Sequence, residues 1–240
     1  MIVVLAIDAL EYTLVQRFNC VNLKQKYCGK TDISEFSEPR TMVLWTSFMA
    51  GRNMEQEVLS MGNEAMWGFK MDIQETFFHQ FENPVIIDLP GFSYDLNQHR
   101  QERELLRQFF EAQDQEEKNA IRKDYNDQTF AHHRKIKETF DMALKEEHDL
   151  VLAYFSIADV IGHLNFGNRG LMKIIYRDLD EIARKVQNPM VILSDHGMIE
   201  VGIFGDHSNY GFWSTRSRDL KTPKITQFSE IINNIMSNNY

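Results

Sequence analysis

Cysteine is scarce in this sequence, which contains only Cys20 and Cys28 among its 240 residues. The two thiols could pair with each other. Two reduced thiols in a cytoplasmic protein are the simpler interpretation, because disulfides are rare in that compartment. We therefore expect a cytoplasmic location.

Basic residues are outnumbered, with 26 Lys and Arg against 35 Asp and Glu, and the formal net charge is −9. A protein that coats nucleic acid needs a basic surface, so the sequence argues against that class. An acidic balance does not exclude a phosphate-bearing substrate, because bound divalent cations reverse the local field at a site.

Long apolar runs are also missing. Residues 1–7 are apolar, but this run ends at Asp8 and is far too short to span a membrane. It has neither a basic n-region nor a small-residue cleavage site, so we interpret it as a buried strand rather than a signal peptide. With 43% hydrophobic and 25% charged residues, and no repeat or low-complexity segment, the sequence is typical of a globular protein without a membrane partner.

Short apolar runs alternate with amphipathic stretches along the chain. The runs predict buried strands at residues 2–7, 84–89, 150–156 and 190–194. Apolar residues at helical spacing predict helices at residues 10–18, 43–50, 171–186 and 225–235. This alternation is typical of an α/β fold. We predict one domain over residues 1–240, with a mostly parallel central sheet sandwiched by helices.

A charged segment at about residues 100–149 interrupts this pattern. Two apolar faces within it predict a helical lobe or a pair of long helices that flank the sheet. Its charge runs are interpreted as solvated faces without a chemical role. The adjacent His132 and His133 look like a metal motif, but we expect them to be solvated because they lie in this charged segment.

Acidic residues and histidines follow three of the predicted strands. The first strand ends in Asp8, the third runs into Asp159 and His163, and the last ends in Asp195 and His196. In open α/β sheets, ligands bind beyond the carboxyl ends of the strands. The sequence therefore predicts that these side chains meet at one edge of the sheet.

Their spacing fits a pair of metal sites. Asp159 and His163 are four residues apart, so on a helix they share a face. His207, in a Gly-bounded loop, adds a third imidazole. Each residue alone has an ordinary structural explanation, such as a helix N-cap for Asp8, and the joint pattern carries the prediction. Mixed Asp and His ligands suit zinc or manganese, and the lack of cysteine ligands argues against a structural zinc site.

Five segments resemble the alkaline phosphatase superfamily, particularly its type I phosphodiesterase/nucleotide pyrophosphatase branch. They occur in the family's order and extend over nearly the whole chain. The segments are Val-Val-Leu-Ala-Ile-Asp8, Thr41-Met-Val-Leu-Trp-Thr-Ser-Phe-Met-Ala-Gly51, Asp159-Val-Ile-Gly-His163, Leu-Ser-Asp195-His196-Gly-Met and Gly-Asp-His207. The resemblance implies the α/β/α sandwich of the family and two divalent metal ions, zinc or manganese.

The resemblance also implies a role for each residue. One metal would be held by Asp8, Asp195, His196 and Thr41. The other would be held by Asp159, His163 and His207. Thr41 would also be the nucleophile, since it stands ten residues before Gly51, where family members carry their Thr or Ser. Thr46 and Ser47 are competing hydroxyls that we interpret as helix interior.

Two neighbours of Thr41 are candidate substrate contacts. If Thr41 begins a helix, the backbone N–H of Met42 is available to a phosphate oxygen. Arg40 offers a charged contact, although a surface position explains it equally well.

The chain departs from the family pattern close to the nucleophile. Val43 replaces the usual proline, and Leu44 stands where the nucleotide pyrophosphatase branch often carries a substrate-binding Asn. After Gly51 the chain reads Arg52-Asn53-Met54 and lacks the Pro and His-Gly that commonly follow. These departures concern diester or nucleotide specificity and leave the metal ligands intact.

We therefore expect a two-metal phosphoesterase that hydrolyses a small phosphorylated substrate through a phospho-Thr41 intermediate, as phosphodiesterases and nucleotide pyrophosphatases of the family do. A phosphomonoesterase or phosphomutase is the alternative within the superfamily. Sulfatase activity is disfavoured, because the segment from Thr41 lacks the Cys/Ser-x-Pro-x-Arg motif. From another class, a relative that binds metal or a phosphorylated ligand without turnover stays open.

Overall fold

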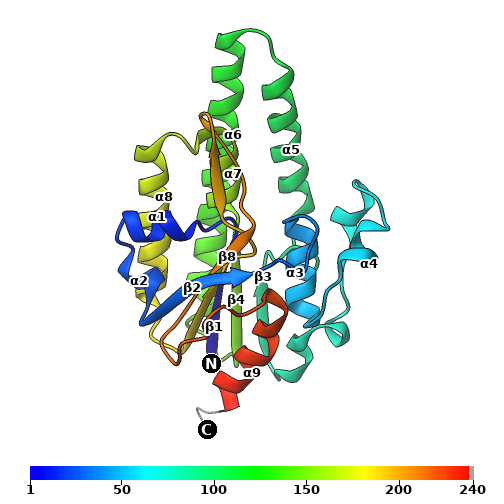
Figure 1. Ribbon diagram of the computed structural model, residues 1–240, viewed down its shortest axis with the longest axis vertical. Coiled ribbons are helices and arrows are strands. Elements are labelled where there is room, and N and C mark those ends of the chain that lie inside the picture. The colour runs from blue at the N-terminus through cyan, green and yellow to red at the C-terminus, as the bar shows by residue number, and fades with distance from the viewer. Residues whose placement is uncertain (238–240) are drawn as a thin grey trace.

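A six-stranded sheet forms the centre of the computed structural model, which describes residues 1–237 (Figure 1). Across the sheet the strands follow the order β2-β8-β5-β1-β4-β3. Their bounds are β1 Ile2–Ile7, β2 Tyr27–Asp32, β3 Pro84–Ile87, β4 Leu150–Phe155, β5 Met190–Leu193 and β8 Tyr210–Thr215. Neighbouring strands among β3, β4, β1 and β5 pair in parallel, whereas β8 is antiparallel to both of its neighbours.

Helices surround this sheet, and a two-stranded ribbon stands apart from it. The α-helices are α1 Tyr12–Arg17, α2 Val21–Lys24, α3 Thr41–Ala50, α4 Glu55–Leu59, α5 Leu96–Glu111, α6 Gln115–Ala143, α7 Ile157–Asn165, α8 Arg169–Lys185 and α9 Phe228–Ser237. Short 3-10 helices lie at η1 Ala65–Gly68, η2 Ile73–Glu75, η3 Phe77–Gln80 and η4 Ile225–Gln227. The antiparallel ribbon consists of β6 Met198–Val201 and β7 Phe204–His207.

The central strand β1 is buried on both faces, because its side chains alternate between two apolar cores. Val3, Leu5 and Ile7 pack with α1, α2, α7, α8 and the later part of α6. Val4 and Ala6 point to the opposite face and pack with α3, α4 and α9. A mostly parallel sheet covered by helices on both faces is the fold class predicted from the sequence, and it is confirmed.

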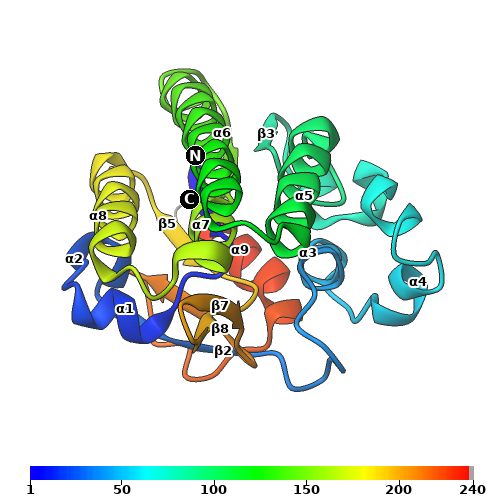
Figure 2. The same cartoon turned by 90° about the horizontal axis from the view of Figure 1, so that it is seen from above.

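The charged segment forms a helical hairpin of α5 and α6 between β3 and β4. In Figure 1 these two helices rise together beyond the sheet, and Figure 2 shows α5 on the side of α3 and α4. Asp95 caps α5 by accepting the Gln98 N–H, and Asp114 caps α6 by accepting the N–H groups of Glu116 and Glu117. The segment that the sequence predicts as a helical lobe or a pair of long helices thus contains two long helices.

Two predictions about the chain need correction. His132 and His133 are not solvated: the two residues are 8% and 6% exposed, and each imidazole lies 2.7 Å from a carboxylate, that of Asp88 and that of Asp178 respectively. The antiparallel elements β2, β6, β7 and β8 were not predicted, because they lack the continuous apolar run that marks a strand buried on both faces. Within residues 1–237, no helix combines the length and apolarity that a membrane span needs.

Candidate metal centre and active site

Asp8 stands at the carboxyl end of β1, where the chain turns sharply. Ala9 adopts a left-handed backbone conformation with φ of 52°, which is uncommon for a residue other than glycine. The N–H of Leu10 then donates to the Ser194 hydroxyl at 2.9 Å. This bond joins the loop after β1 to the loop after β5, and it brings Asp8 close to Asp195.

Asp195 and His196 follow β5 and are completely buried. Nε2 of His196 lies 3.4 Å from a carboxylate oxygen of Asp8 and 3.4 Å from one of Asp195. Gly211 on β8 permits this loop to form, since a Cβ there would come within 2.1 Å of the Ser194 carbonyl oxygen. The three residues predicted to share one metal are therefore brought together.

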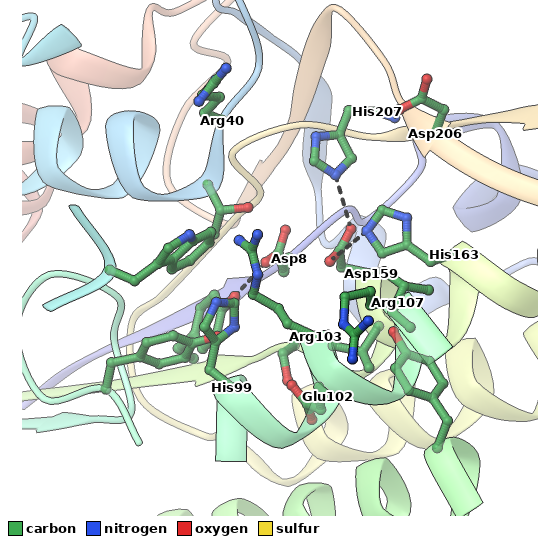
Figure 3. A pocket seen from close by; sticks show the side chains of 18 of the residues that line it. Asp8, Arg40, His99, Glu102, Arg103, Arg107, Asp159, His163, Asp206 and His207 are labelled. Carbon is green, nitrogen blue, oxygen red and sulfur yellow. Dashed lines mark hydrogen bonds and ion pairs between the residues drawn. The ribbon is translucent and has the colours of Figure 1, made fainter. Parts of the chain in front are cut away.

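Asp159 and His163 lie one turn apart on α7, as their spacing predicted. The two carboxylate oxygens of Asp159 point to different histidines: one is 3.3 Å from Nε2 of His163 and the other 3.5 Å from Nε2 of His207 (Figure 3). His207 was predicted to lie in a loop. It is instead the last residue of β7. The ribbon comes close to α7 through Gly205, where a Cβ would be 2.9 Å from the Gly162 carbonyl oxygen.

All three histidines present Nε2 to the cluster and use Nδ1 elsewhere. Nδ1 lies 3.0 Å from the Gly197 carbonyl oxygen in His196, 2.9 Å from that of Pro39 in His207, and 3.4 Å from that of Gly205 in His163. A carbonyl can only accept, so Nδ1 is the donor in each ring and Nε2 is left to face the cluster, as in metal-binding histidines. In His207, burial would lower the pKa of the ring, but Asp159 outweighs burial and raises that pKa to about 9, so a cation bound there would replace the proton on Nε2.

Several buried polar atoms at this site have no hydrogen-bond partner within the described residues. Such atoms cost free energy unless something binds them. They are Oδ1 of Asp8, Oδ1 of Asp159, both carboxylate oxygens of Asp195, Nε2 of His196 and Nε2 of His207. Two groups of these residues place their ligand atoms within 4.8 Å of one another: Asp159, His163 and His207, and Asp8, Asp159 and His196. The donor set fits divalent cations such as zinc or manganese.

Crowded carboxylates make the electrostatics of the site unfavourable without a cation. Burial and the charges of Asp195 and Asp159 raise the pKa of Asp8, and burial raises the pKa of Asp195 to about 7. Burial would also raise the pKa of Asp159, but its two histidines outweigh that effect and lower it. Burial lowers the pKa of His196 to about 3, which keeps its imidazole neutral and able to bind metal.

Thr41 is the first residue of α3 and lines the same cavity as Asp8. Its hydroxyl makes no hydrogen bond to any residue in the part of the chain that the structure describes. Arg40 precedes the helix without a side-chain cap, so the first N–H groups of α3 are available to a ligand. Thr46 and Ser47 instead donate to backbone carbonyls inside the helix and are fully buried, as predicted.

The two predicted substrate contacts differ in what they offer. The guanidinium of Arg40 is bound to Glu38 at 2.6 Å and to Asn63 at 2.9 Å, and Figure 3 shows it apart from the cluster of Asp159 and the histidines. The side chain of Met42 is fully buried, so only its backbone N–H can serve. Both contacts stay predictions.

The site opens into a cavity of about 520 Å³ between the sheet and the helical hairpin. No chemical role was predicted for α5, yet six of its side chains line this cavity: His99, Glu102, Arg103, Leu106, Arg107 and Phe110. Their spacing of three and four residues was a usable signal, because it places them on one helix face. Trp67, from η1, also lines the cavity, whereas Trp45 and Trp213 are buried in the core.

No protein-family model matches the sequence, and no curated protein matches it by sequence. Solved structures do match the fold. Alkaline phosphatase from the Antarctic bacterium TAB5 is 12% identical with a TM-score of 0.53, over 100% of this chain and 98% of that one. A variant of the same enzyme with Mg bound in its M3 site is 11% identical with a TM-score of 0.54, over 98% of this chain and 97% of that one.

A murine ectonucleotide pyrophosphatase/phosphodiesterase 5 is 12% identical over 84% of this chain and 58% of that one. Its TM-score is 0.44. The match to the bacterial enzyme, by contrast, extends over the whole of this chain with a TM-score of 0.53. This chain therefore has the fold of the alkaline phosphatases.

Proposed function

We propose that this protein is a metal-dependent phosphoesterase with two cation sites and Thr41 as its nucleophile. The observation that carries the proposal is the set of buried, unpartnered carboxylate and imidazole atoms around Asp159, with the Nδ1 atoms of all three histidines bonded to carbonyl groups. A buried structural network would pair these atoms with one another. Atoms left open toward a common point suit cations.

Two trios would hold the cations. The first is Asp8, Asp195 and His196, with the Thr41 hydroxyl beside it, and the second is Asp159, His163 and His207. Divalent cations bound there would lower the pKa of the Thr41 hydroxyl and neutralise charge on the phosphoryl oxygens. The Tyr154 hydroxyl donates to the second oxygen of Asp8 and holds that carboxylate in place.

Thr41 would then act from the start of α3. Its Oγ gives up its proton and attacks phosphorus, and the bond to the leaving oxygen breaks, so that oxygen takes up a proton and departs as an alcohol. Water then cleaves the bond between phosphorus and Thr41, which releases phosphate from a monoester or a phosphomonoester from a diester. The first N–H groups of α3, Met42 among them, would be available to the anionic oxygens of a substrate at the same place. Thr41 is 7% exposed and therefore accessible only through the cavity.

Phosphodiesters and pyrophosphate-linked compounds are the first substrate class to test, with phosphomonoesters next. Leu44, at the position of the substrate-binding Asn in the nucleotide pyrophosphatase branch, is fully buried in the core with Val43. A nucleotide contact would therefore have to come from another element of the cavity wall.

The test measures hydrolysis of aryl phosphomonoesters, aryl phosphodiesters and aryl sulfates by the purified protein with zinc or manganese. We expect turnover of a phosphate ester, about two ions per chain, and a phosphoryl group on Thr41 trapped at low pH. In Asp195→Ala, metal content and turnover should fall together. A wild-type protein that binds two ions but cleaves no phosphate ester would be a binding protein, contrary to the proposal.

A further inference from the structure

One face of α5 forms a long wall beside the candidate metal centre. It runs from His99 to Phe110, twelve residues whose eleven helical steps rise by about 16 Å. A phosphoryl group held at Asp8 and Asp159 fills only a small part of a cavity of about 520 Å³. The α5 wall is therefore placed to contact the remainder of a substrate.

Three arginines line the cavity, and their charges are not equally available. Arg40 is ion-paired, as described above. Arg107 is held between Glu104 and Glu111, one helical turn before it and one after. Arg103 has no carboxylate within 4.0 Å in residues 1–237. Of the three arginines, Arg103 is therefore the one whose charge is not neutralised by an acidic side chain of the described residues.

The surroundings of Arg103 favour an anion. Its guanidinium lies 5.4 Å from the ring centroid of Trp67, and the His99 ring packs on the same indole with centroids 3.9 Å apart. Burial and the charge of Arg103 lower the pKa of His99 to about 4, so this imidazole is neutral at neutral pH. Glu102, the acid on this face, is buried and accepts a hydrogen bond from Gln98 instead.

We propose that Arg103 binds a second anionic group of the substrate, one that the metal centre does not hold. The inference rests on the proposed function and names its substrate class: phosphate esters whose organic part carries a carboxylate or a further phosphate. In Figure 3 the Arg103 side chain reaches from α5 into the cavity. The ring of Trp67 and the side chain of Leu106 would contact the apolar part between the two charges.

The competing role for Arg103 is contact with the transferred phosphoryl group itself. The two roles make different predictions. A contact to the transferred group is used by every substrate, so its loss slows all of them alike. A contact to a second anionic group is used only by substrates that have one, so its loss removes a preference.

The experiment compares three esters of one shape: phenyl phosphate, 4-carboxyphenyl phosphate and 1,4-phenylene bisphosphate, or their methyl diesters if the wild type accepts only diesters. We expect wild-type kcat/KM to favour the two doubly functional esters. In Arg103→Met this preference should fall about tenfold or more, as for loss of a charge-assisted hydrogen bond. Arg103→Lys should keep part of it.

Arg100→Met is the matched control, because Arg100 is an exposed arginine on the same helix that does not line the cavity. It should leave the preference unchanged. An unchanged preference in Arg103→Met, or an equal loss on all three esters, would overturn the inference. The carboxylate and phosphate arms also show which second group the site prefers.

A binding measurement separates this inference from the proposed function. Calorimetric titration of the metal-loaded protein with 3-phosphonopropionate and propylphosphonate compares ligands that it cannot hydrolyse. We expect tighter binding of the former, and loss of the difference in Arg103→Met. If the wild type cleaves no ester but shows this Arg103-dependent difference, the proposed function fails and the anion site stands. If the difference is absent, the anion site is refuted whatever the activity.

Discussion

The imidazole rings of His196 and His207 stack, with centroids 3.9 Å apart and an angle of 20° between their planes. The two residues belong to different proposed cation sites, so the stack joins one site directly to the other. Burial keeps His196 neutral, so its ring lies against His207 without repulsion between two charges. We therefore expect metal binding at one site to depend on the other.

Replacement of His207 tests this coupling. His207→Phe keeps an aromatic ring against His196 but removes Nε2, and it should lower the metal content from about two ions per chain to about one. His207→Ala removes the stack as well and should weaken the remaining site further. Metal analysis after gel filtration measures both. Full retention of two ions in His207→Phe would exclude this residue as a ligand.

Thr41→Ala should reduce turnover by about a thousandfold or more, because no other hydroxyl takes its place at the start of α3. The variant should keep its fold, since the Thr41 hydroxyl makes no hydrogen bond within residues 1–237, and Asp8, Asp195 and His196 should still hold the cation beside it. Thr41→Ser should retain activity. Mass spectrometry of the acid-quenched reaction should find the phosphoryl group in wild type and not in Thr41→Ala; Thr46→Val is the control for hydroxyl loss in the same helix.

A pH dependence of stability is expected from Glu102. Burial raises its pKa to about 7, above the 4.5 of an exposed glutamate. The folded state therefore holds a proton that the unfolded state releases, and this contribution is complete below pH 4.5 and lost as the pH rises to about 7. Its upper bound is about 3 kcal/mol, from 1.36 kcal/mol for each pKa unit.

Glu102→Gln cannot ionise and keeps the oxygen that accepts from Gln98. Its free energy of unfolding, measured with urea between pH 4.5 and 8, should vary less with pH than that of wild type. Equal slopes for the two proteins would show that Glu102 titrates normally in the folded state.

The hairpin should depend on the buried pair of His132 and Asp88, which joins α6 to the end of β3 at 2.7 Å. His132→Ala leaves the Asp88 carboxylate buried without this partner and should lower the free energy of unfolding by about 3 kcal/mol. Lys123→Ala, which breaks an exposed pair on the same helix, should change it by less than about 1 kcal/mol. Hydrogen exchange should increase along α5 and α6 in His132→Ala alone.

The meeting of acidic residues at the strand ends could be predicted from the sequence, because parallel strands bring their carboxyl ends to one edge of the sheet. Asp8, Asp159 and Asp195 therefore lie together as predicted. The antiparallel strand β8 was not predicted, since Tyr210–Thr215 has no apolar run and its burial comes from neighbours far along the chain.

The long helices show more clearly what could not be predicted from the sequence. α6 is charged along most of its length, and only packing decides that its later half, with His132 and His133, lies against the core. Arg103 was assigned to a solvated face for the same reason. A charge pattern does not reveal that one side of a helix faces a cavity.

The hairpin of α5 and α6 is a connection between two neighbouring parallel strands, β3 and β4. The proposed ligands and Thr41 all lie outside it. Substitutions in the hairpin can therefore change the cavity wall while the proposed metal centre stays fixed. A library randomised at positions 99, 103, 106, 107 and 110 would sample new wall chemistries without changing a proposed ligand of either cation, so this crossover is the segment in which to alter the proposed substrate preference.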